Sequence, residues 1–243
     1  MASGISPRGV HVVEPAPSDW LRGTGVHLGG ELPDAPAVAL IAVKPQMMGA
    51  ALPRLQSMGN GTTLFVSIAA GTTLATLGGM LGARSPLIRA MPNTPAAVGR
   101  GITALIGNDH VSVAQMALAE ALLAAVGQTL RLQDESQMDA VTAVSGSGPA
   151  YVFHLIEAMA AAGEAEGLPR DMALHLARAT VAGAGHLAGN AEDPPDQLRR
   201  NVTSPGGTTA AALDVLMDAE CGFPPLLRRA IAAAAARARA LSE

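Results

Sequence analysis

The feature that most constrains the fold is a fully apolar run, Ala37-Val-Ala-Leu-Ile-Ala-Val43, which Lys44 and Pro45 bring to a stop. A strand without a polar face is typical of a parallel sheet that is covered on both sides. Other runs with strand character recur in the first half of the chain, at residues 9–13, 62–68, 86–90, 101–106 and 128–132. Helical stretches lie between several of them, at residues 46–58, 73–81 and 112–126. This alternation predicts a doubly wound α/β sheet over residues 1–133.

The second half of the chain, residues 134–243, contains no convincing strand. Helices are expected at residues 149–163, 169–188, 208–217 and 224–241, and Asp193-Pro-Pro-Asp196 marks a break between two of them. Proline is tolerated at a helix start, as at Pro169, because the N–H there has no helical partner. The sequence therefore predicts an α/β domain over residues 1–133 and an all-helical domain over residues 134–243.

The composition limits the classes of partner. The chain is 49% hydrophobic and only 15% charged, which is below the usual quarter. Either a subunit contact buries much of the surface, or the composition reflects a general alanine-rich bias. The net charge is −4 and no Lys/Arg cluster is interleaved with aromatic residues, so nucleic acid is not an expected partner.

The cysteine count and the hydropathy limit the cellular locations in which the protein is expected. The single cysteine, Cys221, excludes an internal disulfide and offers no metal-ligand spacing, so no metal is expected. No apolar run reaches the length of a membrane span, and the N-terminus lacks a basic-then-apolar signal pattern. We therefore expect a cytoplasmic protein without a membrane contact.

The segment Asn201-Val-Thr-Ser-Pro-Gly-Gly-Thr-Thr209 precedes an Ala-rich helical run. Pro205 favours a turn, and Gly206 and Gly207 permit backbone conformations closed to other residues. Main-chain N–H groups at the following helix start have no helical partner and carry positive potential, so they suit a small carboxylate. The alternative is a plain loop with a threonine N-cap.

Two further segments follow predicted strands. Ligands of open α/β sheets gather at the carboxyl ends of strands, and Ala42-Val-Lys-Pro45 and Ser67-Ile-Ala-Ala-Gly71 both stand at such ends. Their small residues would let a flat ring approach the backbone, and Lys44 could reach a ribose or phosphate. The alternatives are a lysine that simply leaves the core and ordinary strand termination.

Three more positions are candidates. In Met91-Pro-Asn-Thr-Pro95 two prolines hold Asn93, whose amide could bind substrate or cofactor or form an Asx-type turn. Ser145-Gly-Ser-Gly-Pro149 could be an anion nest or a capped helix start with small residues for tight packing. Glu14 follows a predicted strand, where an acidic side chain can bind a ribose 2′-hydroxyl and repel a 2′-phosphate, or can simply be solvated.

Together and in this order, five motifs resemble pyrroline-5-carboxylate reductases: Ala42-Val-Lys-Pro-Gln46, Ser67-Ile-Ala-Ala-Gly71, Met91-Pro-Asn-Thr-Pro95, Ser145-Gly-Ser-Gly-Pro-Ala-Tyr151 and Val202-Thr-Ser-Pro-Gly-Gly-Thr208. The resemblance implies a Rossmann-like domain followed by a helical domain that interlocks two subunits, sometimes within a decamer. It implies reduction of 1-pyrroline-5-carboxylate to L-proline, the last step of proline biosynthesis, with NADPH or NADH as hydride donor.

The same resemblance implies roles for residues. The substrate carboxylate would lie on the backbone at Gly206 and Gly207 and on the Ser204 hydroxyl, while Thr208 would hydrogen-bond the ring nitrogen. Asn93 is added to the expected substrate contacts on the chemistry of its amide alone. The nicotinamide and its ribose would be bordered by two sets of residues, namely Ala42, Val43, Lys44 and Pro45, and Ala69, Ala70 and Gly71. Glu14 favours NADH, whereas the habits of the family favour NADPH, and the preference stays open.

One part of the family pattern has no match. Family members begin with a strand and a Gly-x-Gly-x-x-(Gly/Ala) turn that holds the pyrophosphate, whereas the match here begins near residue 4, and Gly23, Gly25 and Gly29 follow no suitable strand. We therefore expect an N-terminally incomplete Rossmann-like domain. Two other readings stay open: a non-catalytic dimeric relative that binds a small carboxylate without the dinucleotide, and another imine or hydroxyacid reductase.

Overall fold

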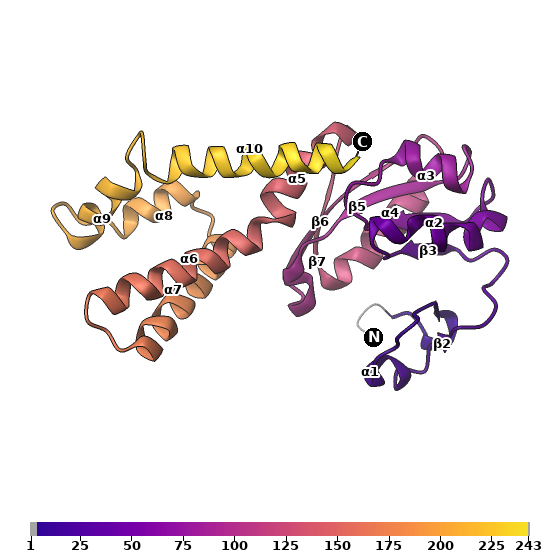
Figure 1. Ribbon diagram of the computed structural model, residues 1–243, viewed down its shortest axis with the longest axis horizontal. Coiled ribbons are helices and arrows are strands. Elements are labelled where there is room, and N and C mark those ends of the chain that lie inside the picture. The colour runs from indigo at the N-terminus through magenta and orange to yellow at the C-terminus, as the bar shows by residue number, and fades with distance from the viewer. Residues whose placement is uncertain (1–3, 243) are drawn as a thin grey trace. The chain divides into compact units, whose positions relative to one another are not determined.

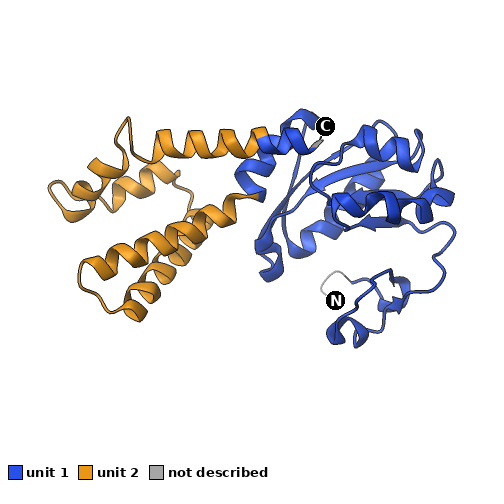
Figure 2. Cartoon of the chain, viewed as in Figure 1, with its two compact units in different colours: residues 1–146, 237–243 blue, residues 147–236 orange. Residues whose placement is uncertain are grey.

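The computed structural model describes residues 4–242 and divides into two compact units, shown in different colours in Figure 2. The first unit holds the residues up to Gly146 together with those from Arg237 onward, and the second is Ser147–Ala236. The first unit is α/β and the second is helical, which confirms the predicted fold class.

A five-stranded sheet forms the centre of the first unit. Its strands lie side by side in chain order: β3 (Val38–Ile41), β4 (Leu64–Ser67), β5 (Leu87–Met91), β6 (Gly101–Gly107) and β7 (Gly127–Arg131). All neighbours are parallel except β5 and β6, which are antiparallel. Only the short 3₁₀ turn η4 (Thr94–Val98) joins these two strands, and a parallel pair needs a longer crossover. Five of the predicted strands are thus confirmed.

Helices cover both faces of this sheet (Figure 1). One face carries α2 (Met48–Ala51), α3 (Leu74–Leu81) and the 3₁₀ turns η2 (Pro45–Met47) and η3 (Leu52–Met58), packed over a core that includes Phe65 and Leu87. The other face carries α4 (Val113–Leu123), followed by η5 (Ala124–Val126), over a core that includes Val66 and Ile88. Successive residues of β4 and β5 therefore alternate between two buried faces, as their apolar sequences predict.

The helix expected over residues 46–58 is wrong in part. Only α2 is α-helical, and 3₁₀ turns flank it on both sides. Pro45 and Pro53 stand at the starts of these 3₁₀ turns, because proline cannot donate the hydrogen bond of a helix interior.

The strand expected at residues 9–13 is shorter and lies outside the main sheet. It is β1 (His11–Val12), which pairs in parallel with β2 (His27–Leu28) in a two-stranded sheet next to η1 (Pro7–Gly9) and α1 (Asp19–Arg22). His11 and His27 are in register, and their rings stack with centroids 4.5 Å apart. Among the described residues, β3 consequently pairs on one side only, and Leu40 is 59% exposed.

Between the sheet and the helical unit the chain forms η6 (Glu135–Gln137), α5 (Met138–Val141) and a π-helical turn, η7 (Thr142–Gly146). Within the described range no residue after β7 belongs to a strand, as expected. Pro149 lies in the first turn of the next helix, where it cannot donate to a carbonyl of the preceding turn. The regular α-helical hydrogen-bond pattern is therefore interrupted at this point, and the π-turn takes its place.

The second unit consists of α6 (Gly148–Ala165), α7 (Arg170–Asn190), α8 (Pro195–Asn201), α9 (Thr208–Leu216) and most of α10 (Phe223–Ser242). Helix α8 was not expected, whereas the other four helices were. The short loop between α6 and α7 makes them an αα-hairpin. A Cβ added to Gly163 would lie 3.3 Å from the Cβ of Ala173, so small residues set the close approach of this pair.

Candidate functional site

The loops after β3 and β4 lie next to each other at the carboxyl edge of the sheet. Ile41 is in register with Ser67, and the N–H of Ile68 donates to the carbonyl of Ile41 at 3.0 Å. Ala42, Lys44 and Pro45 follow β3 with exposed side chains, whereas Val43 is half-buried. The structure therefore brings the two predicted cofactor loops together.

The loop after β4 is held from within. The N–H of Ala69, a buried residue, donates to Oγ of Ser67 at 3.4 Å, and Ala70 is exposed. Gly71 has φ +73°, and a Cβ there would lie 2.7 Å from the carbonyl oxygen of Leu241. Only glycine combines this left-handed backbone with so close an approach, so Gly71 lets the last turn of α10 lie against the loop ahead of α3.

Asn93 follows the carboxyl end of β5. Its Oδ1 accepts the N–H of Ile102 at 3.0 Å, and its Nδ2 donates to Oγ of Ser145 at 3.3 Å. The side chain makes no cap bond to its own turn, so the Asx-type alternative is wrong. Asn93 instead joins two motifs that are far apart in the sequence, and its amide keeps a second N–H for another acceptor.

The motif at residues 145–149 is not a capped helix start. Ser147 is already in a helical conformation and its side chain makes no cap bond. The end of the π-turn lies next to the end of β5, because a Cβ at Gly146 would be in ordinary van der Waals contact with Sδ of Met91, at 3.7 Å.

Residues 204–207 form a β-turn in the second unit. The N–H of Gly207 donates to the carbonyl of Ser204 at 3.0 Å, and Gly206 has φ +69°. Proline at the second position and a left-handed glycine at the third are typical of a type II turn. The turn leads directly into α9, with Ser204, Pro205, Gly206 and Thr208 all exposed.

Main-chain donors open α9. The cap residue is Gly207, so the alternative of a threonine N-cap is wrong, and the N–H of Ala211 donates to the carbonyl of Gly207 at 3.2 Å. The N–H groups of residues 208–210 precede that first helical bond and have no carbonyl within the helix to pair with. Such a helix start, with exposed Ser204 and Thr208 hydroxyls beside it, is suited to binding an anion.

Glu14 lies two residues beyond β1. It is exposed, and its Oε1 accepts the N–H of Ala16 at 3.0 Å, which fixes the carboxylate on its own turn. Over residues 4–242 no three His, Cys, Asp or Glu side chains gather as metal ligands, and no helix in that range is long and apolar enough to cross a membrane.

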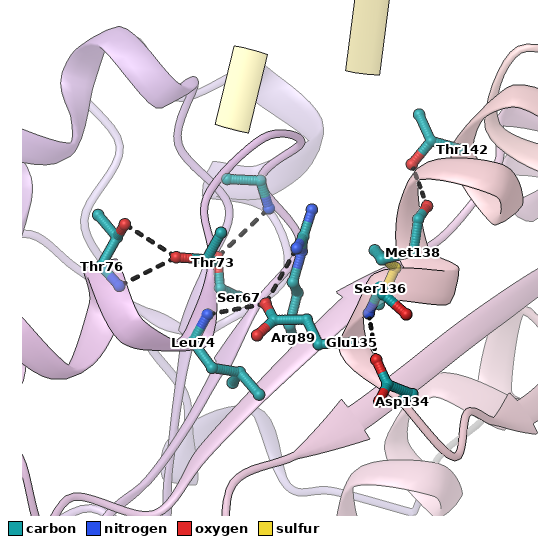
Figure 3. Close-up of polar contacts among 11 residues, drawn as sticks. Ser67, Thr73, Leu74, Thr76, Arg89, Asp134, Glu135, Ser136, Met138 and Thr142 are labelled. Carbon is teal, nitrogen blue, oxygen red and sulfur yellow. Dashed lines mark hydrogen bonds and ion pairs between the residues drawn. The ribbon is translucent and has the colours of Figure 1, made fainter. Parts of the chain in front are cut away.

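Two charged residues that the sequence analysis missed lie beside the cofactor loops, and Figure 3 shows them together. Arg89 is on β5 and only 3% exposed, and its Nη1 donates to Oε1 of Glu135 at 2.9 Å. The same oxygen accepts the N–H of Leu74, the first residue of α3, at 2.9 Å. An arginine within an otherwise apolar strand was the signal that could have revealed this pair.

A sheet with adjoining strand-end loops, followed by a helical unit with an exposed helix start, is typical of two-part oxidoreductases with a Rossmann-like domain. The family model described as pyrroline-5-carboxylate reductase dimerisation matches residues 135–241. The pyrroline-5-carboxylate reductase of Pseudomonas aeruginosa is 47% identical over 206 residues, which cover 85% of this chain and 75% of that protein. The chain belongs to the pyrroline-5-carboxylate reductase family.

Solved structures agree with this assignment. A pyrroline-5-carboxylate reductase from Coxiella burnetii is 36% identical with a TM-score of 0.90, over 100% of this chain and 92% of that one. The Plasmodium falciparum pyrroline carboxylate reductase, solved with NADP bound, is 28% identical with a TM-score of 0.82, over 96% of this chain and 87% of that one. The non-catalytic alternative is therefore not favoured.

Substituting Gly71 with alanine tests the close approach in the cofactor loop. Because the backbone is left-handed and a main-chain oxygen of Leu241 blocks the new Cβ, Gly71→Ala is expected to lower the free energy of unfolding by about 1–3 kcal/mol. Gly79 lies in α3 with nothing within 4 Å of an added Cβ, so Gly79→Ala should raise it by up to about 1 kcal/mol. Denaturant unfolding of both variants measures these two changes in the free energy of unfolding. The same change in both variants would contradict the close approach of Leu241 to Gly71.

Proposed function

We propose that this chain reduces 1-pyrroline-5-carboxylate to L-proline with NADPH or NADH, the reaction of its family. The observation that carries this proposal is the 47% identity with a curated reductase over 85% of the chain, which extends through both units. The substrate is a small cyclic imino acid, so the site needs an anion-binding element and a face for the nicotinamide.

The start of α9 supplies the anion-binding element. In our proposal the backbone at Gly206 and Gly207 and the hydroxyl of Ser204 hold the substrate carboxylate. The N–H of Gly207 closes the turn, so the donors are the N–H of Gly206 and the N–H groups of residues 208–210, which follow Gly207 at the start of α9. Oγ1 of Thr208 bonds the ring nitrogen, and Asn93 offers its remaining amide N–H to the substrate. The helix dipole adds to the attraction, because residues 206–208 lie at its positive end.

The carboxyl edge of the sheet fits the dinucleotide. Residues 42–45 and 69–71 adjoin there, and the small side chains of Ala42 and Ala70 are exposed. We assign both loops to the nicotinamide and its ribose. Glu14 follows β1 in the separate two-stranded sheet, and we assign it to the 2′-hydroxyl of the adenosine ribose on the chemistry of its carboxylate. When bound, the reduced nicotinamide supplies a hydride.

The reaction does not need a strong acid or base from the protein. The protonated C=N bond accepts the hydride at C5, the π electrons become the nitrogen lone pair, and the nitrogen keeps its proton. The product amine takes a further proton from water at neutral pH. No titratable side chain lies within residues 204–208, and the main task of the protein is to orient the two reactants.

The chain acts as a homo-oligomer, in keeping with the match to a dimerisation region. Exposed apolar side chains are numerous on the helical unit and suit a subunit contact, among them Val152, Phe153, Met172, Leu176, Leu187, Val215 and Leu227. We propose a dimer as the basic assembly and a decamer as a larger one, residues 1–133 and 134–243 as the functional domains, no nucleic acid partner and a cytoplasmic location.

Turnover by the purified 243-residue chain tests the proposed reaction. We expect saturable oxidation of NADPH or NADH that depends on 1-pyrroline-5-carboxylate and yields proline in equal amount. The assay follows absorbance of the reduced nicotinamide together with proline formation. Binding of proline or another cyclic carboxylate without any turnover would favour the non-catalytic reading instead.

Removing the Thr208 hydroxyl tests its contact with the ring nitrogen. Thr208→Ala is expected to lower kcat/KM by roughly 10- to 100-fold, because one hydrogen bond to a charged group, worth about 1.5–3 kcal/mol, is lost. Thr62→Ala, at an exposed position of the first unit, is the matched control and should leave kcat/KM unchanged. Equal kinetics for the Thr208 variant and the control would refute the role.

Neutralising Glu14 tests its proposed contact with the adenosine ribose of the dinucleotide. Glu14→Gln removes the negative charge that repels a 2′-phosphate, so kcat/KM for NADPH relative to NADH should rise by roughly three- to tenfold. Glu31→Gln, another exposed acid of the N-terminal segment, serves as the control. An unchanged ratio in the Glu14 variant would remove this residue from the site.

A further inference from the structure

Arg89 is a buried cation in the middle layer of the first unit. It lies on β5, in register with Ser67 at the end of β4, and its side chain is 3% exposed. Its Nε has no hydrogen-bond partner among the described residues. A buried guanidinium needs a counter-charge, because desolvation of an unpaired ion is costly, and Glu135 provides it at 2.9 Å.

Glu135 reaches two elements with one oxygen. Its Oε1 accepts from Nη1 of Arg89 and from the N–H of Leu74, each at 2.9 Å. Leu74 opens α3, so the carboxylate also lies at the positive end of that helix. The ion pair therefore ties the first turn of α3 to β5 (Figure 3).

The position of Glu135 is itself fixed. It is the first residue of η6, which a capping box closes: Oδ1 of Asp134 accepts the N–H of Ser136 at 2.7 Å, and Oε1 of Gln137 accepts the N–H of Asp134 at 3.3 Å. Hydrogen bonds from the side chain and main chain of Ser136 hold the pKa of Asp134 below its ordinary value. Asp134 thus stays an ionised acceptor at neutral pH, and Glu135 projects from a rigid turn.

The first turn of α3 continues directly from the loop at residues 69–71. Thr73 caps the helix by accepting the N–H of Thr76 at 3.1 Å, and only Thr72 separates this cap from Gly71. A displacement of Leu74 is therefore transmitted to the loop that borders the nicotinamide in the proposed function. We propose that Glu135 is a positioning residue for dinucleotide binding, acting by clamping the start of α3 to Arg89.

This inference rests on the proposed function for its kinetic consequence, but the clamp itself can be tested without cofactor. Glu135→Ala should speed amide hydrogen exchange in peptides that cover residues 69–77 by about tenfold, because Leu74 loses its external acceptor. Glu135→Gln keeps an oxygen for the Leu74 N–H and should fall between Glu135→Ala and the unaltered chain. Unchanged exchange in Glu135→Ala would overturn the clamp.

Kinetic measurements distinguish a positioning role of Glu135 from a role in stability alone. In Glu135→Ala we expect KM for the dinucleotide to rise about five- to tenfold while KM for the imine stays constant. The double variant Arg89→Met with Glu135→Ala removes the orphaned cation and should recover part of the lost thermal stability, yet keep the raised KM. Recovery of KM together with stability, or a raised KM for both substrates, would overturn the positioning role.

A matched control lies on the same sheet. Glu120 of α4 pairs with Arg131 of β7, which is 52% exposed, and neither residue contacts Leu74, so Glu120→Gln should change neither the exchange of residues 69–77 nor KM. If the unaltered chain neither binds nor oxidises NADPH or NADH, the proposed function fails, and the exchange data alone decide on the clamp. If it is active while Glu135→Ala keeps the original KM, only the positioning role fails.

Discussion

The parallel alignment of β3, β4 and β5 is the constraint on which the first unit depends. Because Ile41 pairs with Ser67 and Ser67 with Arg89, the three strands end at one edge, and the loops that follow them converge there. Helices on both faces make this alignment possible, since a parallel sheet must be covered on each side. A slip of one residue would turn buried Phe65 and Ser67 towards the opposite helix layer. The register of the sheet therefore sets how the loops after β3 and β4 lie relative to each other.

Main-chain groups, more than reactive side chains, carry the proposed chemistry in both units. At the sheet edge these groups belong to the adjoining loops at residues 42–45 and 69–71, and at α9 they are the N–H groups of residues 208–210, which follow Gly207. In such an arrangement the backbone must be held in place. Two side chains from outside the loops do this: Asn93 bonds Ile102 and Ser145, and Glu135 bonds Arg89 and Leu74.

Local patterns predicted most of the fold. The apolar run at 37–43 gave β3, and the Pro-Gly-Gly turn gave the start of α9 at Thr208, because burial and turn geometry act over a few neighbouring residues. Long-range pairs were not predictable in the same way. Asn93 meets Ser145 across 52 positions and Arg89 meets Glu135 across 46, and no local signal connects them. The π-turn and the separate pairing of β1 with β2 likewise depend on tertiary context.

Within residues 4–242, strand β3 has a neighbour on one side only, and its apolar residue Leu40 is exposed. A row of free amide and carbonyl groups beside such a side chain is a template for cross-strand addition, and so for aggregation at high concentration. The sequence limits this hazard by keeping the strand to four residues between Pro36 and the Lys44-Pro45 stop, since proline cannot donate to a growing ladder. We therefore expect a longer β3 to make the protein more prone to aggregate.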